Sequence, residues 1–129
     1  MVLPIPDQNF SEFLVAAKIA TYAAQEDSTR VTPRLKGSNQ LEFRKGALFY
    51  RDIYFGGDFF VGQETVYFQT NPIWAMSYAG GINTGEDLAK TPGVYQFLQA
   101  ALRAVPYQAP FRGPEMFTND QFEYSNRIL

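Results

Sequence analysis

The chain contains no cysteine and no histidine among its 129 residues. It therefore forms no disulfide, has no thiolate nucleophile, and has no ligand set of the Cys/His kind that binds structural zinc. Catalytic triads that use imidazole as the general base are excluded for the same reason. Enzymatic chemistry, if present, would depend on carboxylates, tyrosine, lysine or a hard metal ion.

Basic charge and long apolar runs are also scarce. The formal net charge is −2, so the chain lacks the excess of Lys and Arg that drives binding to nucleic-acid backbones. No segment approaches the ~20 apolar residues that span a bilayer, and the N-terminal sequence MVLPIPDQNF lacks the basic and apolar regions of a secretion signal. We therefore expect a cytoplasmic protein with no direct nucleic-acid partner and no membrane partner.

The length and composition are those of one folded domain. Apolar residues make up 46% of the chain and charged residues 19%, which is typical of globular proteins. A chain of 129 residues buries roughly two-thirds of the surface that it exposes when unfolded. Residues 1–129 are thus expected to form a single domain with a substantial core.

Aromatic residues concentrate between Phe49 and Gly81, where ten of the 21 lie. Two clusters of turn-forming residues, Gly56-Gly57-Asp58 and Gln69-Thr70-Asn71-Pro72, divide this stretch into three strands. A shorter strand, Leu41 to Arg44, precedes them, and Lys45-Gly46 is typical of a hairpin turn. The pattern predicts an antiparallel meander.

Two amphipathic helices flank the meander. The first is expected to begin at Asn9 or Ser11, either of which can cap a helix, and the second at Thr91, with Pro106 ending it. The first helix carries an apolar stripe, and its polar positions are predicted to face away from that stripe. The stripe comprises Phe10, Phe13, Leu14, Ala17, Ala20 and Ala24, widened by Val15, Ile19 and Tyr22, and the polar positions are Glu12, Lys18 and Gln25. In the second helix the apolar residues are Val94, Phe97, Leu98, Ala101 and Leu102.

The remaining segments are assigned more simply. Residues 26–40 read as a loop, whose Arg30, Arg34 and Lys36 form either a solvated surface or a small basic patch for an anion. A closing strand is expected from Gln121 to Ile128. The predicted fold is an α+β domain: an antiparallel meander sheet of four to five strands with two helices packed on one face.

Alternation along the strands places aromatic residues on both faces of this sheet. Tyr50, Asp52 and Tyr54 share one face, and Phe49, Ile53 and Phe55 occur among the residues of the other. Because helices on one side would leave aromatic side chains uncovered on the opposite side, a second cover is expected. It would be sheet curvature, a ligand or another subunit.

A candidate ligand site follows from the same alternation. Aromatic rings would supply flat walls, and a few polar groups would fix the orientation of a small, partly apolar ligand. The candidate residues are Tyr50, Asp52, Tyr54, Glu64, Trp74, Tyr78 and Arg112. In the Pro- and Gly-bounded turn that holds it, Arg112 would pair with an anion, with Asp52 or with Glu64, or would anchor the turn to backbone carbonyl groups.

Three other interpretations remain open. The aromatic residues could simply form the core, with the carboxylates as structural partners. The aromatic face could instead form a homodimer, since aromatic residues and Met are enriched at interface centres. Asp52 and Glu64 could also act as a catalytic carboxylate pair. We assign no catalytic residue, no metal ligand and no cofactor, and expect a small-molecule ligand and a homodimer as partners.

A set of motifs, in order along the chain, resembles an uncharacterised bacterial domain family of unknown function. These motifs are FLVAAKIATYA, RDIYFGG, FVGQETVYF, PIWAMSYAGGI, FLQAALRAVP and PFRGPEMF, and the resemblance extends from about Phe10 to about Tyr124. The resemblance implies soluble relatives, some of which carry the domain behind a helix-turn-helix DNA-binding module. This chain has no such module, so the resemblance implies a sensing or dimerising domain rather than direct DNA binding. It supplies no catalytic residues.

Overall fold

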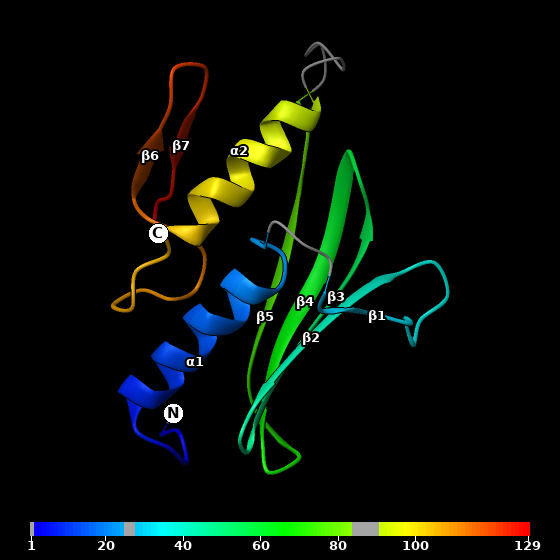
Figure 1. Cartoon of the computed structure of the whole chain (residues 1–129), viewed down its shortest axis with the longest axis vertical. Helices are drawn as coiled ribbons and strands as arrows, with labels where there is room; N and C mark the ends of the chain where they lie inside the picture. Colours follow the sequence, from blue (N-terminus) through cyan, green and yellow to red (C-terminus); the bar gives the residue numbers. More distant parts are fainter. Residues whose placement is uncertain (1, 25–27, 84–90) are drawn as a thin grey trace.

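The computed structural model describes residues 2–24, 28–83 and 91–129, the last range without the side chains of Thr91 and Pro92. Five antiparallel strands form one sheet in the order β1-β2-β3-β4-β5 (Figure 1). The strands are β1 (Arg30–Val31), β2 (Asn39–Lys45), β3 (Leu48–Gly56), β4 (Phe59–Phe68) and β5 (Asn71–Gly81). The predicted meander is therefore confirmed. The assignment of 26–40 entirely to a loop is wrong, because β1 pairs with β2 through Arg30 opposite Leu41.

The turns between strands lie where the sequence predicts them, and each has a backbone reason. Gly56 has a φ of 97°, and a Cβ at this position would lie 1.9 Å from the Phe59 carbonyl oxygen, so only glycine fits. The next turn uses Gln69 and Thr70, with φ of 48° and 71°. These left-handed conformations close a tight hairpin but are unfavourable for residues other than glycine.

Helix α1 (Asp7–Ala20) crosses one face of the sheet and forms the core with it. Phe10, Phe13, Leu14 and Ala17 pack against residues of the central strands, among them Tyr50. The predicted caps at Asn9 and Ser11 are wrong, since the helix begins at Asp7 after Pro6 and has no side-chain cap. Proline has a fixed φ that suits the start of a helix, which explains the earlier start. The helix ends before Ala24, and Gln25 lies outside the described residues.

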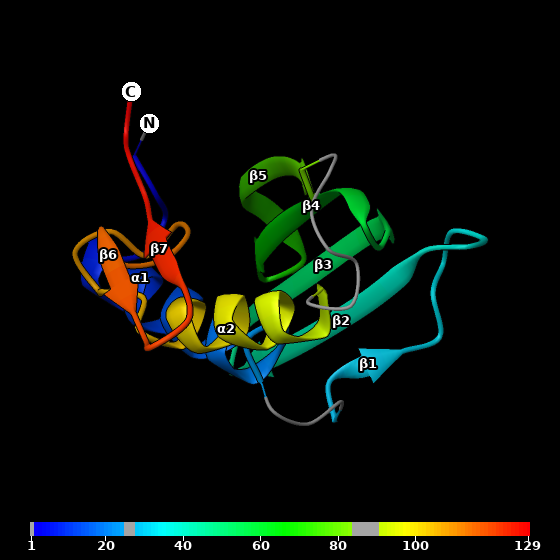
Figure 2. The ribbon, with the colours of Figure 1, turned by 90° about the horizontal axis from the view of Figure 1, so that it is seen from above.

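Helix α2 (Thr91–Arg103) lies on the same face of the sheet as α1, as predicted (Figure 2). The side chain of the predicted cap, Thr91, lies outside the described part of the structure. Beyond α2, strands β6 (Met116–Thr118) and β7 (Glu123–Ser125) form a separate two-stranded hairpin. This hairpin flanks α2 on the side away from the sheet, and Phe97 of α2 packs against its Phe117 and Phe122. The predicted closing strand is thus shorter than expected and pairs with β6.

The far face of the sheet, opposite the helices, is partly covered by arginine side chains. The guanidinium groups of Arg44 and Arg51 lie 4.6 and 5.0 Å from the centre of the Phe49 ring. Towards the other end of β3 and β4, Phe59 and Val61 remain 68% and 55% exposed. In the described part of the chain, neither helix has the length and apolar character needed to cross a membrane.

Candidate functional site

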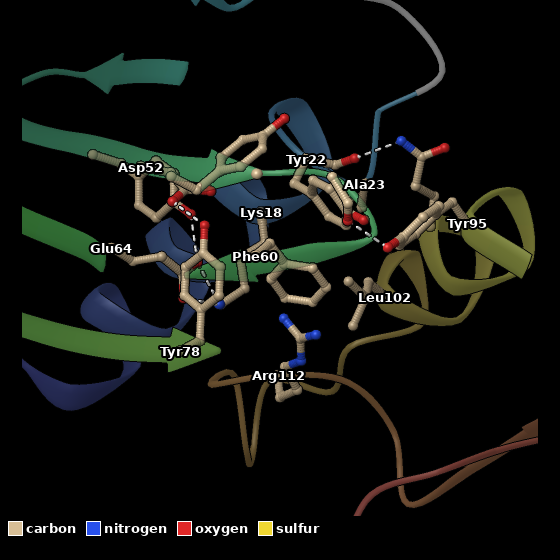
Figure 3. Close-up of a pocket in the computed structure, with 15 residues that line it drawn as sticks. Lys18, Tyr22, Ala23, Asp52, Phe60, Glu64, Tyr78, Tyr95, Leu102 and Arg112 are labelled. Atoms are coloured by element: carbon tan, nitrogen blue, oxygen red, sulfur yellow. Dashed lines mark hydrogen bonds and ion pairs between the residues drawn. The ribbon is translucent and has the colours of Figure 1, made fainter. Parts of the chain in front are cut away.

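A cavity of about 250 Å³ lies between the sheet and the two helices (Figure 3). Its floor comes from strands β3, β4 and β5, and its walls come from the C-terminal end of α1, from α2 and from the loop that follows α2. The lining residues are Lys18, Tyr22, Ala23, Tyr50, Asp52, Tyr54, Gly56, Gly57, Phe60, Glu64, Tyr78, Tyr95, Gln99, Leu102 and Arg112. Four charged side chains and five tyrosines therefore line one cavity.

Two carboxyl groups lie side by side at the centre of the sheet. Asp52 of β3 is the direct cross-strand partner of Glu64 of β4, and both point to the helix-covered face. They are 3% and 5% exposed. Burying a charged group costs free energy unless it is paired or hydrogen-bonded. The contacts of these two carboxyl groups therefore determine whether each is ionised.

The negative charge of Glu64 is balanced by a lysine from α1. The Nζ atom of Lys18 donates to both carboxylate oxygens of Glu64, at 2.7 and 2.9 Å, and the Tyr50 hydroxyl donates to Oε1. Burial lowers the pKa of the Lys18 ammonium, while the adjacent Glu64 carboxylate acts in the opposite direction. The prediction that Lys18 faces away from the core is wrong: this side chain is 7% exposed and ends in an ion pair. Its long aliphatic stem lets the ammonium reach Glu64 from a position beside the apolar stripe.

Asp52 has a different environment. The Tyr78 hydroxyl of β5 donates to Asp52 Oδ1 at 2.6 Å, and no other hydrogen bond to this carboxyl group occurs among the described residues. Burial raises the pKa of Asp52 to about 7, although the hydrogen bond from Tyr78 opposes this shift. Burial and the nearby Asp52 also raise the pKa of the Tyr78 hydroxyl, which therefore stays protonated and donates. Asp52 thus changes its charge near neutral pH.

A glycine makes the contact between Tyr78 and Asp52 sterically feasible. Gly62 of β4 lies between Tyr54 and Tyr78 in the register of the sheet. A Cβ at Gly62 would lie 2.5 Å from the Tyr78 hydroxyl and 2.6 Å from Tyr54 Cβ. The absence of a side chain therefore lets the Tyr78 ring cross over β4 to reach β3.

Arg112 enters the cavity from the loop between α2 and β6, and its guanidinium points towards the space between Tyr78 and Leu102 (Figure 3). It lies 6.0 Å from the centre of the Tyr78 ring. Within the described part of the chain it makes neither an ion pair with Asp52 or Glu64 nor a hydrogen bond to a backbone carbonyl. The anion partner therefore remains as a prediction for this side chain.

Aromatic rings form much of the remaining wall. Tyr22, just beyond α1, packs edge-on against Tyr54, with ring centres 6.4 Å apart. Burial raises the pKa of Tyr22 to about 12, so its hydroxyl is protonated at neutral pH. Phe60 packs against Tyr78, and the Tyr95 hydroxyl of α2 donates to the Gly57 carbonyl at 2.6 Å. This last contact ties the helix to the turn between β3 and β4 at the mouth of the cavity.

The structure brings together six of the seven residues predicted for a ligand site. Tyr50, Asp52, Tyr54, Glu64, Tyr78 and Arg112 all line the cavity. Trp74 does not: its ring packs between Phe10 and Phe111, at ring-centre distances of 5.8 and 6.1 Å. It shares the sheet face of the five predicted strand residues but lies one row beyond Met76, under the N-terminal half of α1.

Several lining residues were not predicted for the site. Lys18, Tyr22, Tyr95 and Gln99 come from the helices or from the segment after α1. The sequence signal available for Lys18 was its position four residues after Leu14, which places the two side chains on the same side of the helix. Tyr95 and Gln99 are four positions apart and therefore share one face of α2, which is the corresponding signal for that helix.

One comparison with known proteins identifies a family for this chain. The sequence model of the family described as Domain of unknown function (DUF5680) matches residues 52–129, more than half of the chain. The chain belongs to this DUF5680 family. No curated protein and no solved structure matches it.

The DUF5680 match covers one side of the cavity and not the other. Asp52, Glu64, Tyr78 and Arg112 lie within the matched residues, whereas Lys18 and α1 lie outside them. The pairing of Lys18 with Glu64 therefore joins the matched segment to the preceding part of the chain.

Proposed function

We propose that this DUF5680 domain binds a small, partly apolar molecule in the cavity between the sheet and the two helices. The observation that carries the proposal is the placement of Asp52, a buried carboxyl group with a strongly raised pKa, at the wall of a half-open cavity. Strongly perturbed titratable groups in clefts are frequent at functional sites, whereas an apolar residue would fill a purely structural position at lower cost.

The dimensions and lining support a ligand of modest size. A volume of about 250 Å³ lies just below the roughly 300–1,000 Å³ typical of sites for drug-sized ligands. The aromatic walls supply apolar contact area, and Asp52, Tyr78 and Arg112 supply polar contacts at one end. This combination of a flat apolar wall and a few fixed polar groups is typical of small-molecule sites.

A thermal-shift screen of metabolites tests the proposal, because a ligand that binds only the folded state raises the melting temperature. Methyl NMR signals then locate each hit: Ala23 and Leu102 line the cavity, whereas Ala75 lies on the far face. We expect hits to shift the first two signals and not the third. A broad library without a hit, or hits that shift only Ala75, would contradict the proposal.

A matched pair of variants adds a second measurement. Tyr78→Phe keeps the ring but removes the hydroxyl that donates to Asp52, whereas Tyr67→Phe removes a hydroxyl from the opposite face. Ligand-induced stabilisation should fall in Tyr78→Phe and persist in Tyr67→Phe. Equal stabilisation of both variants would place the ligand elsewhere.

A regulatory role extends the proposal by analogy. The sequence motifs resemble a bacterial family in which some members carry this domain behind a helix-turn-helix module, and in such a protein a bound metabolite would act as a signal. We assign no catalytic residue: Asp52 and Glu64 lie side by side as a catalytic pair requires, but Lys18 holds both oxygens of Glu64.

Homodimerisation through the far face is the second candidate function. Phe55, Phe59 and Val61 are exposed and share that face near the turn between β3 and β4. Exposed aromatic and aliphatic groups in one patch favour association with another protein surface. Sedimentation over micromolar concentrations tests this function, and we expect Phe59→Ser to shift the equilibrium towards monomer. A wild-type chain that is monomeric throughout would contradict it.

A further inference from the structure

The ionic groups of the cavity are unequally satisfied. Lys18 and Glu64 neutralise each other through two short contacts, and Asp52 accepts a hydrogen bond from Tyr78. Arg112 makes only a ring contact with Tyr78, and among the described residues no carboxylate or carbonyl group accepts from its guanidinium. The group that remains to be satisfied in the cavity is therefore a cation with a planar, forked set of donors.

The charge balance of the cavity indicates the sign of a ligand. With Lys18 and Glu64 paired and Asp52 protonated, the charged groups that line the cavity sum to one positive charge, carried by Arg112. A guanidinium binds planar anions through two parallel hydrogen bonds and prefers carboxylate and phosphate groups. A cationic ligand would meet two cations and a carboxylate that is already paired.

The walls near Arg112 indicate the rest of the ligand. Phe60, Tyr78 and Leu102 surround the guanidinium in Figure 3. Tyr22 and Tyr54, whose rings pack edge-on, line the same cavity. A flat ring has the shape that contacts such surfaces well, and about 250 Å³ leaves room for a small molecule only.

We infer that the cavity binds a small aromatic monocarboxylate, with its carboxylate on Arg112 and its ring among the tyrosines and Phe60. The inference rests on the proposed function and specifies its ligand class. It assigns Arg112 as the residue that selects for negative charge. Tyr78, which contacts both Arg112 and Asp52, would lie beside the bound carboxylate.

An ionised Asp52 would repel an anionic ligand. Below neutral pH, however, its buried carboxyl group is protonated and carries no charge. Its pKa of about 7 keeps it mostly protonated at pH 6, so it adds no repulsion there. Binding should therefore weaken as Asp52 ionises between pH 6 and pH 8. The titratable and charged groups that line the cavity around Asp52 are Lys18 from α1, Tyr22 after it, Tyr50 and Tyr54 of β3, Glu64 of β4, Tyr78 of β5, Tyr95 of α2 and Arg112.

Calorimetric titration with benzoate and 4-hydroxybenzoate at pH 6 tests the inference, with benzamide as the uncharged analogue. We expect both carboxylates to bind the wild-type chain, and benzamide to bind at least about tenfold more weakly, as expected for the loss of a hydrogen bond to a charged group. Arg112→Gln should weaken the carboxylates by a similar factor, and Arg112→Lys should weaken them less. Arg44→Gln removes the same charge from the far face and should change nothing.

The outcomes separate this inference from the proposed function. If benzamide binds as tightly as benzoate and Arg112→Gln leaves both unchanged, the cavity binds small molecules but the inference is wrong. If neither carboxylate binds at millimolar concentration, the inference is wrong, and hits from the metabolite screen decide the proposed function independently. Urea unfolding of each variant shows whether it is folded, and Arg112→Lys carries the test should Arg112→Gln fail to fold.

Discussion

Replacing Asp52 with asparagine should change how the stability of the protein depends on pH. The carboxyl group has a pKa of about 7 in the folded chain, against 3.8 for the free side chain. The folded state therefore binds a proton more tightly than the unfolded state does. Between about pH 4 and pH 7 the unfolded state ionises first, so the free energy of unfolding falls as the pH rises.

The size of this effect follows from the two pKa values. Each unit of difference is worth about 1.4 kcal/mol, so a shift from 3.8 to about 7 makes ionised Asp52 unfavourable by up to about 4 kcal/mol above pH 7. That amount is a large fraction of the roughly 5–15 kcal/mol by which domains are stable. Asp52→Asn keeps an oxygen that can accept from Tyr78 but carries no ionisable group, so it should remove this dependence.

Urea unfolding at several values between pH 4.5 and pH 8 measures the effect as the difference between wild type and variant. We expect the wild-type chain to lose stability relative to Asp52→Asn as the pH rises, with most of the loss complete near pH 7.5. Asp58→Asn, at an exposed position in the turn after β3, is the matched control and should follow the wild-type profile. A constant difference between wild type and Asp52→Asn across this range would refute the reasoning.

Three further substitutions test other parts of the fold by the same unfolding assay. Lys18→Met leaves Glu64 buried without its partner and should cost about 3–5 kcal/mol, whereas the double variant with Glu64→Leu should recover much of that loss. Gly62→Ala should displace the tyrosine that crosses it and cost about 1–3 kcal/mol, while Gly57→Ala, where an added Cβ meets nothing within 4 Å, should cost under 1 kcal/mol. Thr70→Gly relieves a φ of 71° and should stabilise the chain by about 1 kcal/mol. Three results would contradict these predictions, one for each substitution. They are a larger loss of stability for the double variant than for Lys18→Met, equal effects of the two glycine substitutions, and destabilisation by Thr70→Gly.

The sheet could be predicted from the sequence because its signals are local. Turn-forming residues mark the ends of β3, β4 and β5, and alternation sorts the residues of each strand onto its two faces. Whether Asp52 and Glu64 share a face was left open, because the register decides which face of one strand continues in the next. Once Asp52 is found opposite Glu64, the remaining contacts follow from the reach of each side chain.

Contacts between distant elements could not be predicted in the same way. Lys18 was assigned to the polar side of α1 because periodicity classifies a lysine by its charge, whereas burial of its stem and pairing with Glu64 depend on how α1 crosses the sheet. Trp74 was grouped with the ligand site because its face is right, but its row in the sheet is set by the bulge at Tyr67 and by α1. The β6 and β7 hairpin packs on α2, so its position required the helix to be placed first.

Gly62 shows how a site can nevertheless be inferred from strand sequences. Asp52 and Tyr78 lie on strands β3 and β5, which are separated by β4, so about 9–10 Å separates their backbones. A tyrosine reaches that far only if the intervening position is empty, and Gly62 provides the empty position in the row of Tyr54 and Tyr78. Glycine in a strand interior weakens the strand, so its presence there requires a compensating contact. Because that contact delivers a hydroxyl to a buried carboxyl group at the edge of a cavity, the glycine contributes to the site as well as to packing.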